Sequence, residues 1–311
     1  MDSRENQVTQ GIDVSVVIPS YNHALFIVDA IESVIQQTFR SWELIIVDDG
    51  STDGSCKLLE SKFGLHNQIK IIFQNNQGAH HAINRGMALA SGRYISILNS
   101  DDIYHPERLQ KLVNYCDQNP VDLAFTLVSP IDANGLIINA EGHPWCRLYA
   151  RLIRELQEDG VKMALLTGNF AITTSNFFFH SRLFLELGGF ANMRYNHDWD
   201  FMARLVHKGM TLKCVGDGPL LSYRIHGGNT ITQNTLKARL ELKRILRSLI
   251  PPADPYCARL VSRIELNMRS IRREHEVRLL TQQLAQIENS RLHKLERLLA
   301  RLISAFRRLF V

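Results

Sequence analysis

The chain has 311 residues, of which 45% are hydrophobic and 22% charged, as is ordinary for a globular protein. No apolar run reaches the roughly 18 residues that a membrane-spanning helix needs. The polar stretch Met1–Gln10 also lacks the apolar core of a signal peptide. The five cysteines are widely spaced, with no CxxC pair and no metal-ligand spacing. We therefore expect reduced thiols in a cytoplasmic protein.

The formal net charge of +5 is spread unevenly along the chain. Residues Leu236–Val311 contain 17 Lys and Arg against 7 Asp and Glu, whereas the residues before them contain 19 against 24. Basic segments of this kind bind nucleic acid or an anionic membrane surface. The contrast indicates two regions with different tasks.

Strand-like and helix-like patterns alternate after a polar tail at 1–12, which we expect to be disordered. Apolar and β-branched runs predict the strands, and apolar residues at helical spacing predict the helices between them. Such alternation is typical of a parallel sheet with helices on both faces. The predicted strands are 14–18, 42–47, 69–73, 94–98 and 121–128, and the predicted helices are 24–37, 55–63, 79–90, 147–157 and 183–187.

Two adjacent aspartates, Asp101 and Asp102, follow the strand predicted at 94–98. Adjacent carboxylates are costly to bury without a cation, and ligands bind at the carboxyl ends of parallel strands. A divalent ion that bridges a diphosphate explains the pair, because Mg²⁺ and Mn²⁺ prefer oxygen ligands. The alternative is that one of the two aspartates caps a helix that begins near His105.

The sequence contains neither of the two common phosphate-binding loops, GxGxxG after the first strand or GxxxxGK[ST]. A nucleotide would instead be held by carboxylates, an aromatic ring and a metal ion. Asp49 can accept a hydrogen bond from a base or a ribose, and Tyr21 can stack on the base. The alternatives are that Asp48 or Asp49 caps a turn, and that Tyr21 only packs at the edge of the sheet.

Several motifs, in this order, resemble the opening of the family 2 glycosyltransferases. They are Val14–Ile18 followed by PSYN, SVIQQTF at 33–39, Glu43–Ser51 followed by Asp53, NQG at 76–78, AINRG at 82–86 and NSDD at 99–102. The resemblance covers about residues 13–230. It implies the GT-A fold, which is Rossmann-like with a mostly parallel sheet. It also implies inverting transfer of a sugar from a nucleotide-sugar, usually with Mg²⁺ or Mn²⁺.

The resemblance assigns roles to residues near the start of the chain and in the acidic pair. Pro19, Tyr21 and Asp49 would line the nucleoside pocket. Asp101 and Asp102 would lie under the diphosphate, with Asp101 contacting the nucleotide and Asp102 acting as the direct metal ligand.

The segment Asn196–Asp200 resembles the family's Glu-Asp motif, in which the aspartate is the general base. Asp198 would therefore deprotonate the acceptor hydroxyl, as the base of an inverting glycosidase activates its nucleophile. Trp199 and Asp200 are candidate contacts for the acceptor or the diphosphate, and a helix cap is the alternative for either aspartate. Residues 174–176 resemble the acceptor-side strand and would face the site.

The segment 223–230 resembles the family's closing Arg-x-His motif. His226 would bind the metal ion or the diphosphate, and Arg224 would contact a phosphate or the acceptor. A purely structural histidine is the alternative. Because Asn99 leaves the acidic cluster one carboxylate short, His226 would complete the shell of the ion.

Three residues depart from the family's pattern. Asn99 stands where the family often has Asp, Ile83 where it often has Arg, and His197 where it has Glu. With Asn99 in place of an aspartate, the site would differ in the metal ion or the donor that it prefers. A contact made by the family's arginine would be lost or taken over by a neighbour: His80, His81 or Arg85.

The basic segment 236–311 is expected to be helical, with a break at Pro251–Pro255. From Tyr256 onward there is no Pro or Gly, and leucines near the end repeat at the spacing of a coiled-coil seam. The apolar stripe is wide and the opposite face is basic, as in a helix that lies on an anionic membrane surface. Docking on the catalytic domain or on a second copy is the alternative. The few aromatic residues argue against nucleic acid.

We thus predict a disordered tail at 1–12, a GT-A domain at 13–235 and a basic amphipathic helical extension at 236–311. The expected activity is metal-assisted, inverting transfer of a hexosyl or N-acetylhexosaminyl group. The expected donor is a UDP-sugar, and the expected acceptor is a glycan or lipid-linked glycan in cell-surface polysaccharide synthesis. The expected location is cytoplasmic, at the inner face of the cell membrane. The alternative is a non-catalytic sugar-nucleotide binder or membrane scaffold of the same fold.

Overall fold

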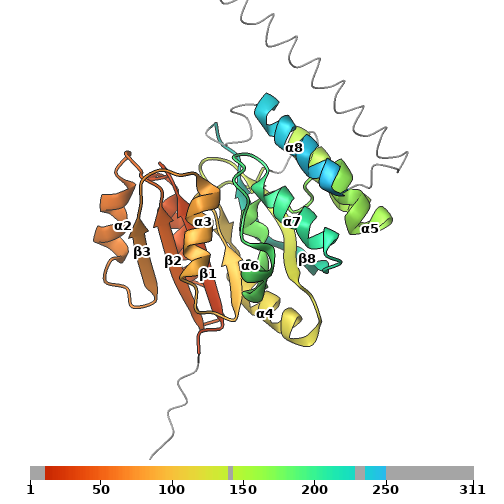
Figure 1. The fold of residues 1–311 in the computed structure, drawn as a ribbon. Coiled ribbons are helices and arrows are strands. Elements are labelled where there is room, and N and C mark those ends of the chain that lie inside the picture. The colour runs from red at the N-terminus through yellow and green to blue at the C-terminus, as the bar shows by residue number, and fades with distance from the viewer. Residues whose placement is uncertain (1–10, 139–142, 228–234, 250–311) are drawn as a thin grey trace, which may run out of the picture. The chain divides into compact units, whose positions relative to one another are not determined.

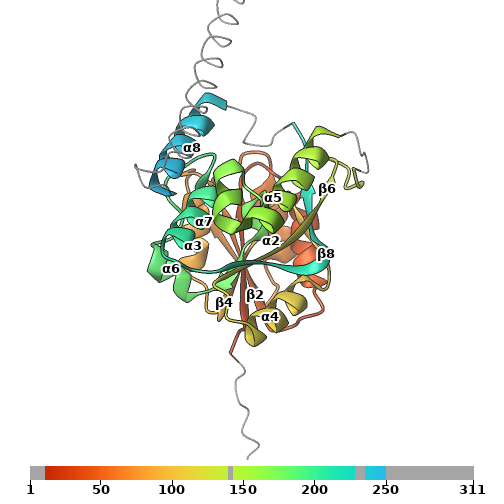
Figure 2. The same cartoon turned by 90° about the vertical axis from the view of Figure 1, so that its right-hand side faces the viewer.

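The computed structural model describes residues 11–138, 143–227 and 235–249. These residues form an eight-stranded sheet covered by helices (Figure 1; Figure 2). The strands are β1 (Val14–Ser20), β2 (Trp42–Asp48), β3 (Ile69–Phe73), β4 (Tyr94–Ile97), β5 (Ile103–Tyr104), β6 (Leu123–Ile131), β7 (Phe178–His180) and β8 (Leu212–Arg224). The helices are α1 (Ile27–Ile35), α2 (Ser55–Phe63), α3 (Ala79–Ala88), α4 (Arg108–Gln118), α5 (Pro144–Thr167), the 3₁₀ turn η1 (Thr174–Asn176), α6 (Arg182–Leu187), α7 (His197–His207) and α8 (Thr235–Leu249).

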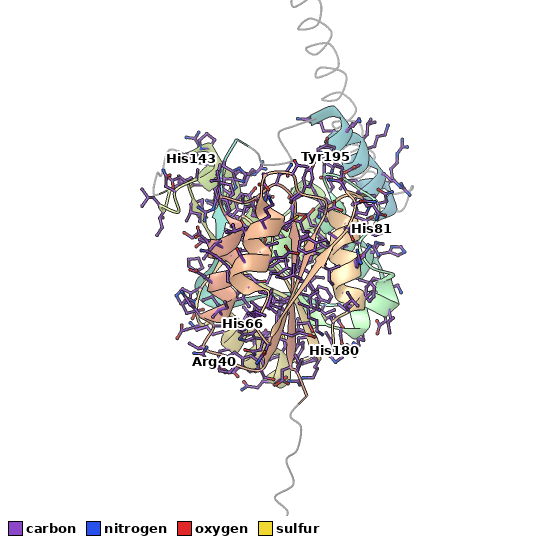
Figure 3. All side chains as sticks on the ribbon, turned by 90° about the vertical axis from the view of Figure 1, so that its left-hand side faces the viewer. Arg40, His66, His81, His143, His180 and Tyr195 are labelled. Carbon is purple, nitrogen blue, oxygen red and sulfur yellow. The ribbon has the colours of Figure 1, made fainter. Side chains whose placement is uncertain are left out.

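The strand order is β3-β2-β1-β4-β7-β6-β8-β5. β3, β2, β1 and β4 run parallel, β7 is antiparallel to both of its neighbours, β8 is parallel to β6, and β5 is antiparallel to β8. The predicted α/β fold with a mostly parallel sheet is confirmed. We call the edge at which β1, β2, β3 and β4 end the carboxyl edge. Figure 3 shows Tyr195 towards this edge and Arg40 and His66 towards the opposite one.

Both faces of the central strands are buried, which explains why their sequences are mostly apolar. Val14, Val16 and Ile18 of β1 are fully buried in one core with residues of α1, α2 and α4. Val17 meets α3, because Gly86 brings the backbone of that helix so close that an added Cβ would lie 2.4 Å from Val17 Cγ1. Helices on both faces, as predicted, therefore fix the ends of the strands in place.

Among the elements that differ from the sequence prediction are β8 and α5. The pattern does not predict β8, because its Gly-Asp-Gly-Pro stretch at 216–219 is typical of a turn. The strand persists because β6 pairs with it irregularly, with register shifts between Phe125 and Val128. Helix α5 is longer than the predicted 147–157, and Gly160, at φ 78°, divides it into two helical pieces.

Helix α8, which the sequence prediction assigns to the basic extension, packs against α7. Residues 250–311 of that extension and 1–10 of the predicted tail lie outside the described residues. The predicted disorder of the N-terminal tail therefore stays a prediction. So do the helices and membrane binding predicted for the extension, and the domain boundary at 235. Within the described ranges, no helix is both long and apolar enough to cross a membrane.

A buried carboxylate ties the strands together at the edge opposite the carboxyl edge. Glu43 is 3% exposed and accepts hydrogen bonds from Ser15 Oγ at 2.7 Å, Ser91 N at 2.7 Å and Lys70 Nζ at 2.8 Å. Burial works to raise the pKa of Glu43, but the bonds from Lys70, Ser91 and Ser15 outweigh it and lower the pKa from its ordinary value.

We expect Glu43→Ala to lower the free energy of unfolding by about 3 kcal/mol, because Ser15 and Ser91 lose their acceptor. Urea unfolding would show a lower midpoint with an unchanged slope. The lowered pKa sets the pH dependence. The carboxylate stabilises the fold above the unfolded pKa of glutamate, and this contribution is lost as the pH falls through the folded pKa. Glu60→Ala, on an exposed position of α2, is the control; equal midpoints for the two variants would contradict the assignment.

Candidate active site

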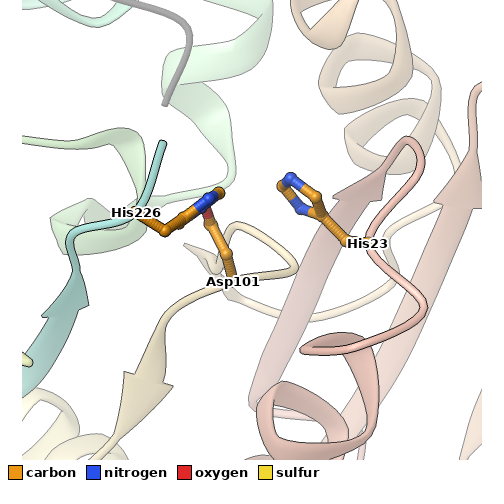
Figure 4. A group of neighbouring side chains, drawn as sticks. All are labelled: His23, Asp101 and His226. Atoms are coloured by element: carbon orange, nitrogen blue, oxygen red, sulfur yellow. The ribbon is translucent and has the colours of Figure 1, made fainter. Parts of the chain in front are cut away.

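Three side chains from separate segments converge at the carboxyl edge (Figure 4). His23 follows β1, Asp101 follows β4 and His226 follows β8, and their ligand atoms all lie within 4.8 Å of one another. His226 Nε2 is 3.0 Å from Asp101 Oδ2, and His23 Nδ1 is 2.7 Å from Ser100 Oγ. The His23–Asp101–His226 cluster is the arrangement in the described part of the chain that fits a metal ion.

The donor atoms of this cluster fit a divalent cation. A carboxylate oxygen suits Mg²⁺ and Mn²⁺, and two imidazole nitrogens add affinity for transition metals. Three protein ligands would leave room in the shell of such an ion for phosphate oxygens of a substrate. The cluster contains the predicted ligand His226 and also His23, which the motif analysis does not identify.

Asp102, predicted as the direct metal ligand, lies outside this cluster and is 1% exposed. Its Oδ1 accepts a hydrogen bond from Arg224 N at 2.9 Å, and its Oδ2 accepts one from Ser175 Oγ at 2.5 Å. Burial, and then the charge of Asp101, raise the pKa of Asp102 well above its ordinary value. Neither aspartate caps α4, which begins six residues beyond Asp102 without a side-chain cap. Asp102 instead joins β4, η1 and the end of β8.

Arg224, predicted as a phosphate or acceptor contact, is 1% exposed beneath the cluster. Its Nη2 is 3.0 Å from Asp29 Oδ2, and its Nε donates to the carbonyl oxygen of Asp101 at 2.8 Å. Its guanidinium lies over the Phe26 ring at 4.9 Å, and the same ring packs against His226 at 4.8 Å. Arg224 therefore holds in place the two loops that carry Asp101 and His226.

Asp49 organises the loop after β3. This carboxylate is 2% exposed; its Oδ1 accepts from Gln77 N at 2.8 Å and Gln74 Nε2 at 2.7 Å, and its Oδ2 accepts from Gly78 N at 2.7 Å. Gly78, at φ 96°, begins α3 in a conformation that other residues rarely adopt. Asp49 therefore fixes the loop between β3 and α3, and its predicted contact with the nucleoside stays a prediction.

The other predicted nucleoside residues lie at the end of β1. Pro19 is in the strand and buried, whereas the Tyr21 ring is 46% exposed just beyond it. Asp48 accepts from Ser51 N at 2.8 Å and Ser51 Oγ at 2.6 Å, so this aspartate caps the turn. An exposed ring at the carboxyl edge is free to stack on a base.

Asp198, the predicted base, lies in the first turn of α7 and is partly buried. Its Oδ2 accepts from Asn169 Nδ2 at 2.6 Å, and its Oδ1 accepts from Trp199 N at 2.8 Å. Burial raises the pKa of Asp198, although the charge of His197, and then the bonds from Trp199 and Asn169, oppose this. A carboxyl with a raised pKa that is held by an amide is well suited to accept a proton.

Asn169 also links Asp198 to the acidic pair. Its Oδ1 accepts from Ile172 N at 3.0 Å, and Ile172 has a φ of 70°, which is unusual for a β-branched residue. The next residue, Thr173, contacts Asp102 at 3.4 Å. Burial, and then the charges of Asp102, Asp101 and Asp198, raise the pKa of Tyr223. All three carboxylates therefore interact electrostatically with the same phenol group.

The two residues after Asp198 make structural contacts. Asp200 Oδ2 forms an ion pair with Arg204 Nε at 2.7 Å, and Trp199 Nε1 donates to the carbonyl oxygen of Leu165 at 2.9 Å. Arg204 in turn donates from Nη2 to the carbonyl oxygen of Gly189 at 2.8 Å. These contacts orient α7, and leave the expected acceptor contacts of Trp199 and Asp200 as predictions.

The family model described as glycosyl transferase family 2 matches residues 15–189, which is more than half of the chain. The chain belongs to glycosyltransferase family 2. Among the relatives of this family 2 member is TuaG of Bacillus subtilis strain 168, whose name assigns it to teichuronic acid biosynthesis. TuaG is 36% identical over 123 residues, 39% of this chain and 49% of TuaG. The chain thus spans about half the length, or less, of the first curated relatives that it matches.

Two solved structures share the GT-A fold with this family 2 member. Staphylococcus aureus TarS 1–349, in complex with UDP-GlcNAc, has a TM-score of 0.60 at 17% identity, covering 82% of this chain and 72% of the TarS chain. The mannosyltransferase PcManGT from Pyrobaculum calidifontis, in complex with GDP-Man and Mn²⁺, has a TM-score of 0.59 at 16% identity, covering 83% and 70%. At these identities the likeness shows the fold alone.

The first departure from the family 2 pattern, Asn99, is bound through its backbone and both side-chain ends. Its Nδ2 donates to Thr173 Oγ1 at 2.8 Å, its Oδ1 accepts from Thr174 Oγ1 at 3.1 Å, and its backbone N donates to Ser175 Oγ at 2.8 Å. The predicted acceptor-side residues 174–176 therefore lie directly beside the end of β4. The Asn99 amide replaces a charge with two hydrogen bonds to this segment.

The other two departures lie in α3 and α7. Ile83 is fully buried in the core. Arg85, one of the three residues expected to replace the family's arginine contact, donates to Gln74 Oε1 at 3.1 Å. His197 Nδ1 is buried and has no hydrogen-bond partner among the described residues. Burial, and then the charge of His197, lower the pKa of His80.

Proposed function

We propose that the protein is an inverting, metal-assisted glycosyltransferase that moves a sugar from a nucleoside diphosphate-sugar to a hydroxyl group. The observation that carries this proposal is the joint occurrence, in a family 2 member, of the His23–Asp101–His226 cluster and of the Asp198 carboxyl, which Asn169, Ile172 and Thr173 link to Asp102. Inverting transfer requires a means to neutralise the leaving diphosphate and one base for the acceptor. No general acid is needed.

A bound Mg²⁺ or Mn²⁺ would neutralise the charge that develops on the diphosphate. Asp101, His226 and His23 would hold the ion, and Ser100 would orient the His23 ring through Nδ1. We assign Asp101 rather than Asp102 as the direct ligand, because both oxygens of Asp102 already accept hydrogen bonds from the protein. Asp102 then keeps the ligand-bearing loops in register.

Asp198 would take the proton from the acceptor hydroxyl as that oxygen attacks the anomeric carbon. The bond between the anomeric carbon and the diphosphate oxygen breaks on the opposite face of the sugar, so one displacement inverts the configuration. Asn169 holds the carboxylate through Oδ2. At the other end of the donor, the exposed Tyr21 ring would stack on the base, with Pro19 and Asp49 lining the pocket.

The donor is expected to be a UDP-sugar, and the group transferred a hexosyl or N-acetylhexosaminyl unit. The TarS complex with UDP-GlcNAc and the PcManGT complex with GDP-Man and Mn²⁺ support a nucleotide-sugar, and the name of TuaG supports a cell-surface glycan as acceptor. A lipid-linked acceptor would place the protein in the cytoplasm at the inner face of the membrane. The segment 256–311 is the proposed membrane or helix contact.

A donor screen tests the proposal. Thermal shifts with a panel of sugar nucleotides, with and without Mn²⁺, identify the donor, and nucleotide release then measures turnover. We expect one donor to raise Tm only together with Mn²⁺ and to release its nucleotide. Calorimetric binding of that donor without turnover for any acceptor would instead favour the non-catalytic sugar-nucleotide binder.

The raised pKa of Asp198 predicts the acid limb of the pH–rate profile. The base must be ionised, so kcat/KM falls as the pH drops through a pKa above the roughly 3.9 of an ordinary aspartate. Asn169→Ala removes a hydrogen bond that lowers this pKa, so the limb should move to higher pH. Asn114→Ala, on an exposed position of α4, is the control. An acid limb that stays in place in Asn169→Ala would contradict the assignment.

A further inference from the structure

One carboxylate of α8 binds a run of backbone amides just before α7. Glu241 Oε1 accepts from Arg194 N at 2.9 Å, and Glu241 Oε2 accepts from Tyr195 N and Asn196 N, both at 3.0 Å. Consecutive backbone N–H groups that point at one anion form a concave anion site. Here the anion is supplied by a helix that lies beyond the residues matched by the family model.

A second set of contacts fixes the same segment to α8. Asn196 Nδ2 donates to the carbonyl oxygen of Ala238 at 2.7 Å and lies 3.2 Å from Glu241 Oε2. The apolar side of α8 is buried, with Ile245 at 1% and Leu246 at 0% exposure, and α8 packs against α7. The carboxylate is thus presented from a helix that is itself held in place.

The clamped residues are the start of the helix that carries the base. Asn196 is the N-cap residue of α7, and its carbonyl oxygen accepts the first helical bond, from Asp200 N at 2.9 Å. Asp198 lies two residues beyond the clamp, and its Oδ1 is held by Trp199 N within the same turn. The side chain of Asn196 makes no capping bond to α7, so the entry of the chain into this turn depends on Glu241.

We propose that Glu241 is a positioning residue for the transfer reaction: its carboxylate fixes residues 194–196 and thereby sets the place of the Asp198 carboxylate. The inference rests on the proposed role of Asp198 as base. A carboxylate offers two acceptor oxygens with a full charge, and charge-assisted bonds are about twice as strong as neutral ones. A glutamine amide at this position would offer one acceptor oxygen instead of two. It could not accept hydrogen bonds from all three backbone N–H groups as the carboxylate does. Misplacement of a reacting group by about 1 Å can cost roughly 10²-fold in rate.

Glu241→Gln is the decisive variant, with kcat, donor KM and amide hydrogen exchange as readouts. We expect kcat to fall by about 10- to 100-fold while donor KM and nucleotide affinity stay within about twofold, because the donor site is built by other segments. Exchange of the amides at 194–196 should become faster. Glu241→Asp, which keeps the charge on a shorter side chain, should recover part of kcat. Glu158→Gln, on an exposed position of α5, is the matched control and should behave as wild type.

The outcomes separate this inference from the proposed function. If Asp198→Asn abolishes turnover while Glu241→Gln leaves kcat unchanged, Glu241 has no positioning role and the proposed function stands. A donor KM that rises in parallel with a fall in Tm would show a purely structural role, and would also overturn the inference. If Asp198→Asn turns over like wild type, the base assignment itself fails, and with it the reason for this inference. Unchanged exchange at 194–196 in Glu241→Gln would show that the clamp does not hold the segment.

Discussion

Asp198→Asn is expected to lower kcat by about 10³-fold, within the range that a general base contributes. The substitution keeps the size of the side chain, and its amide oxygen can still accept from Asn169 or Trp199 N. It removes the capacity to take a proton from the acceptor, and it leaves one of these two donors without its acceptor. Steady-state nucleotide release with the donor found in the screen measures the effect, and donor affinity by calorimetry should stay within about twofold.

Asp217→Asn is the matched control for this prediction, because Asp217 is exposed in β8. It should turn over like wild type. Turnover of Asp198→Asn within about threefold of wild type would remove Asp198 as the base, since no carboxylate then needs to ionise at that position.

Asp101→Asn is expected to abolish the dependence of turnover on Mn²⁺ and to lower kcat/KM by about 10²- to 10³-fold. The metal ion offsets several kcal/mol of developing charge, and each 1.36 kcal/mol is tenfold in rate. In wild type, Mn²⁺ together with UDP should raise Tm; in Asp101→Asn this rise should be lost. The fold should persist, because Asp101 is only partly buried and the Arg224 bond reaches its backbone carbonyl.

Asp102→Asn separates the structural assignment from the expectation drawn from the motif. Asp102 is 1% exposed and accepts bonds from Arg224 N and Ser175 Oγ. An amide in its place leaves one donor unsatisfied, so Tm should fall even without metal. If Asp102→Asn instead keeps its Tm and loses the Mn²⁺ response, while Asp101→Asn keeps that response, Asp102 is the ligand after all.

The sequence alone predicts the α/β fold because its evidence is local. The runs at 14–18, 42–47, 69–73 and 94–98 are each apolar apart from one polar residue, and polar residues follow each of them; a helical pattern then follows the first three. Strand β8 escapes prediction, since glycine and proline at 216–219 conceal a strand that exists only through its pairing with β6. Pairing across the sheet is a long-range property that local propensity does not contain.

The sequence also predicts part of the candidate site. Motifs locate the acidic pair, Asp198 and His226, but not which member of the pair faces outward. That choice depends on Arg224, which is 122 residues from Asp102 in the chain and donates its backbone N–H to it. A signal for His23 exists in the sequence, because this residue comes five positions after the first predicted strand, at the edge where Asp101 is expected. Asn169 and Glu241 follow no motif; only the folded chain brings them to Asp198 and to the start of α7.

The anomeric configuration of the product shows directly whether the sugar is transferred by a single inverting displacement. With the donor from the screen and Mn²⁺, proton NMR can follow the sugar as it is transferred, or released to water in the absence of an acceptor. We expect wild type to form a product of inverted configuration, and Asp198→Asn to form it about 10³-fold more slowly. Retained configuration, or the same rate of product formation in Asp198→Asn, would contradict a single displacement assisted by one base.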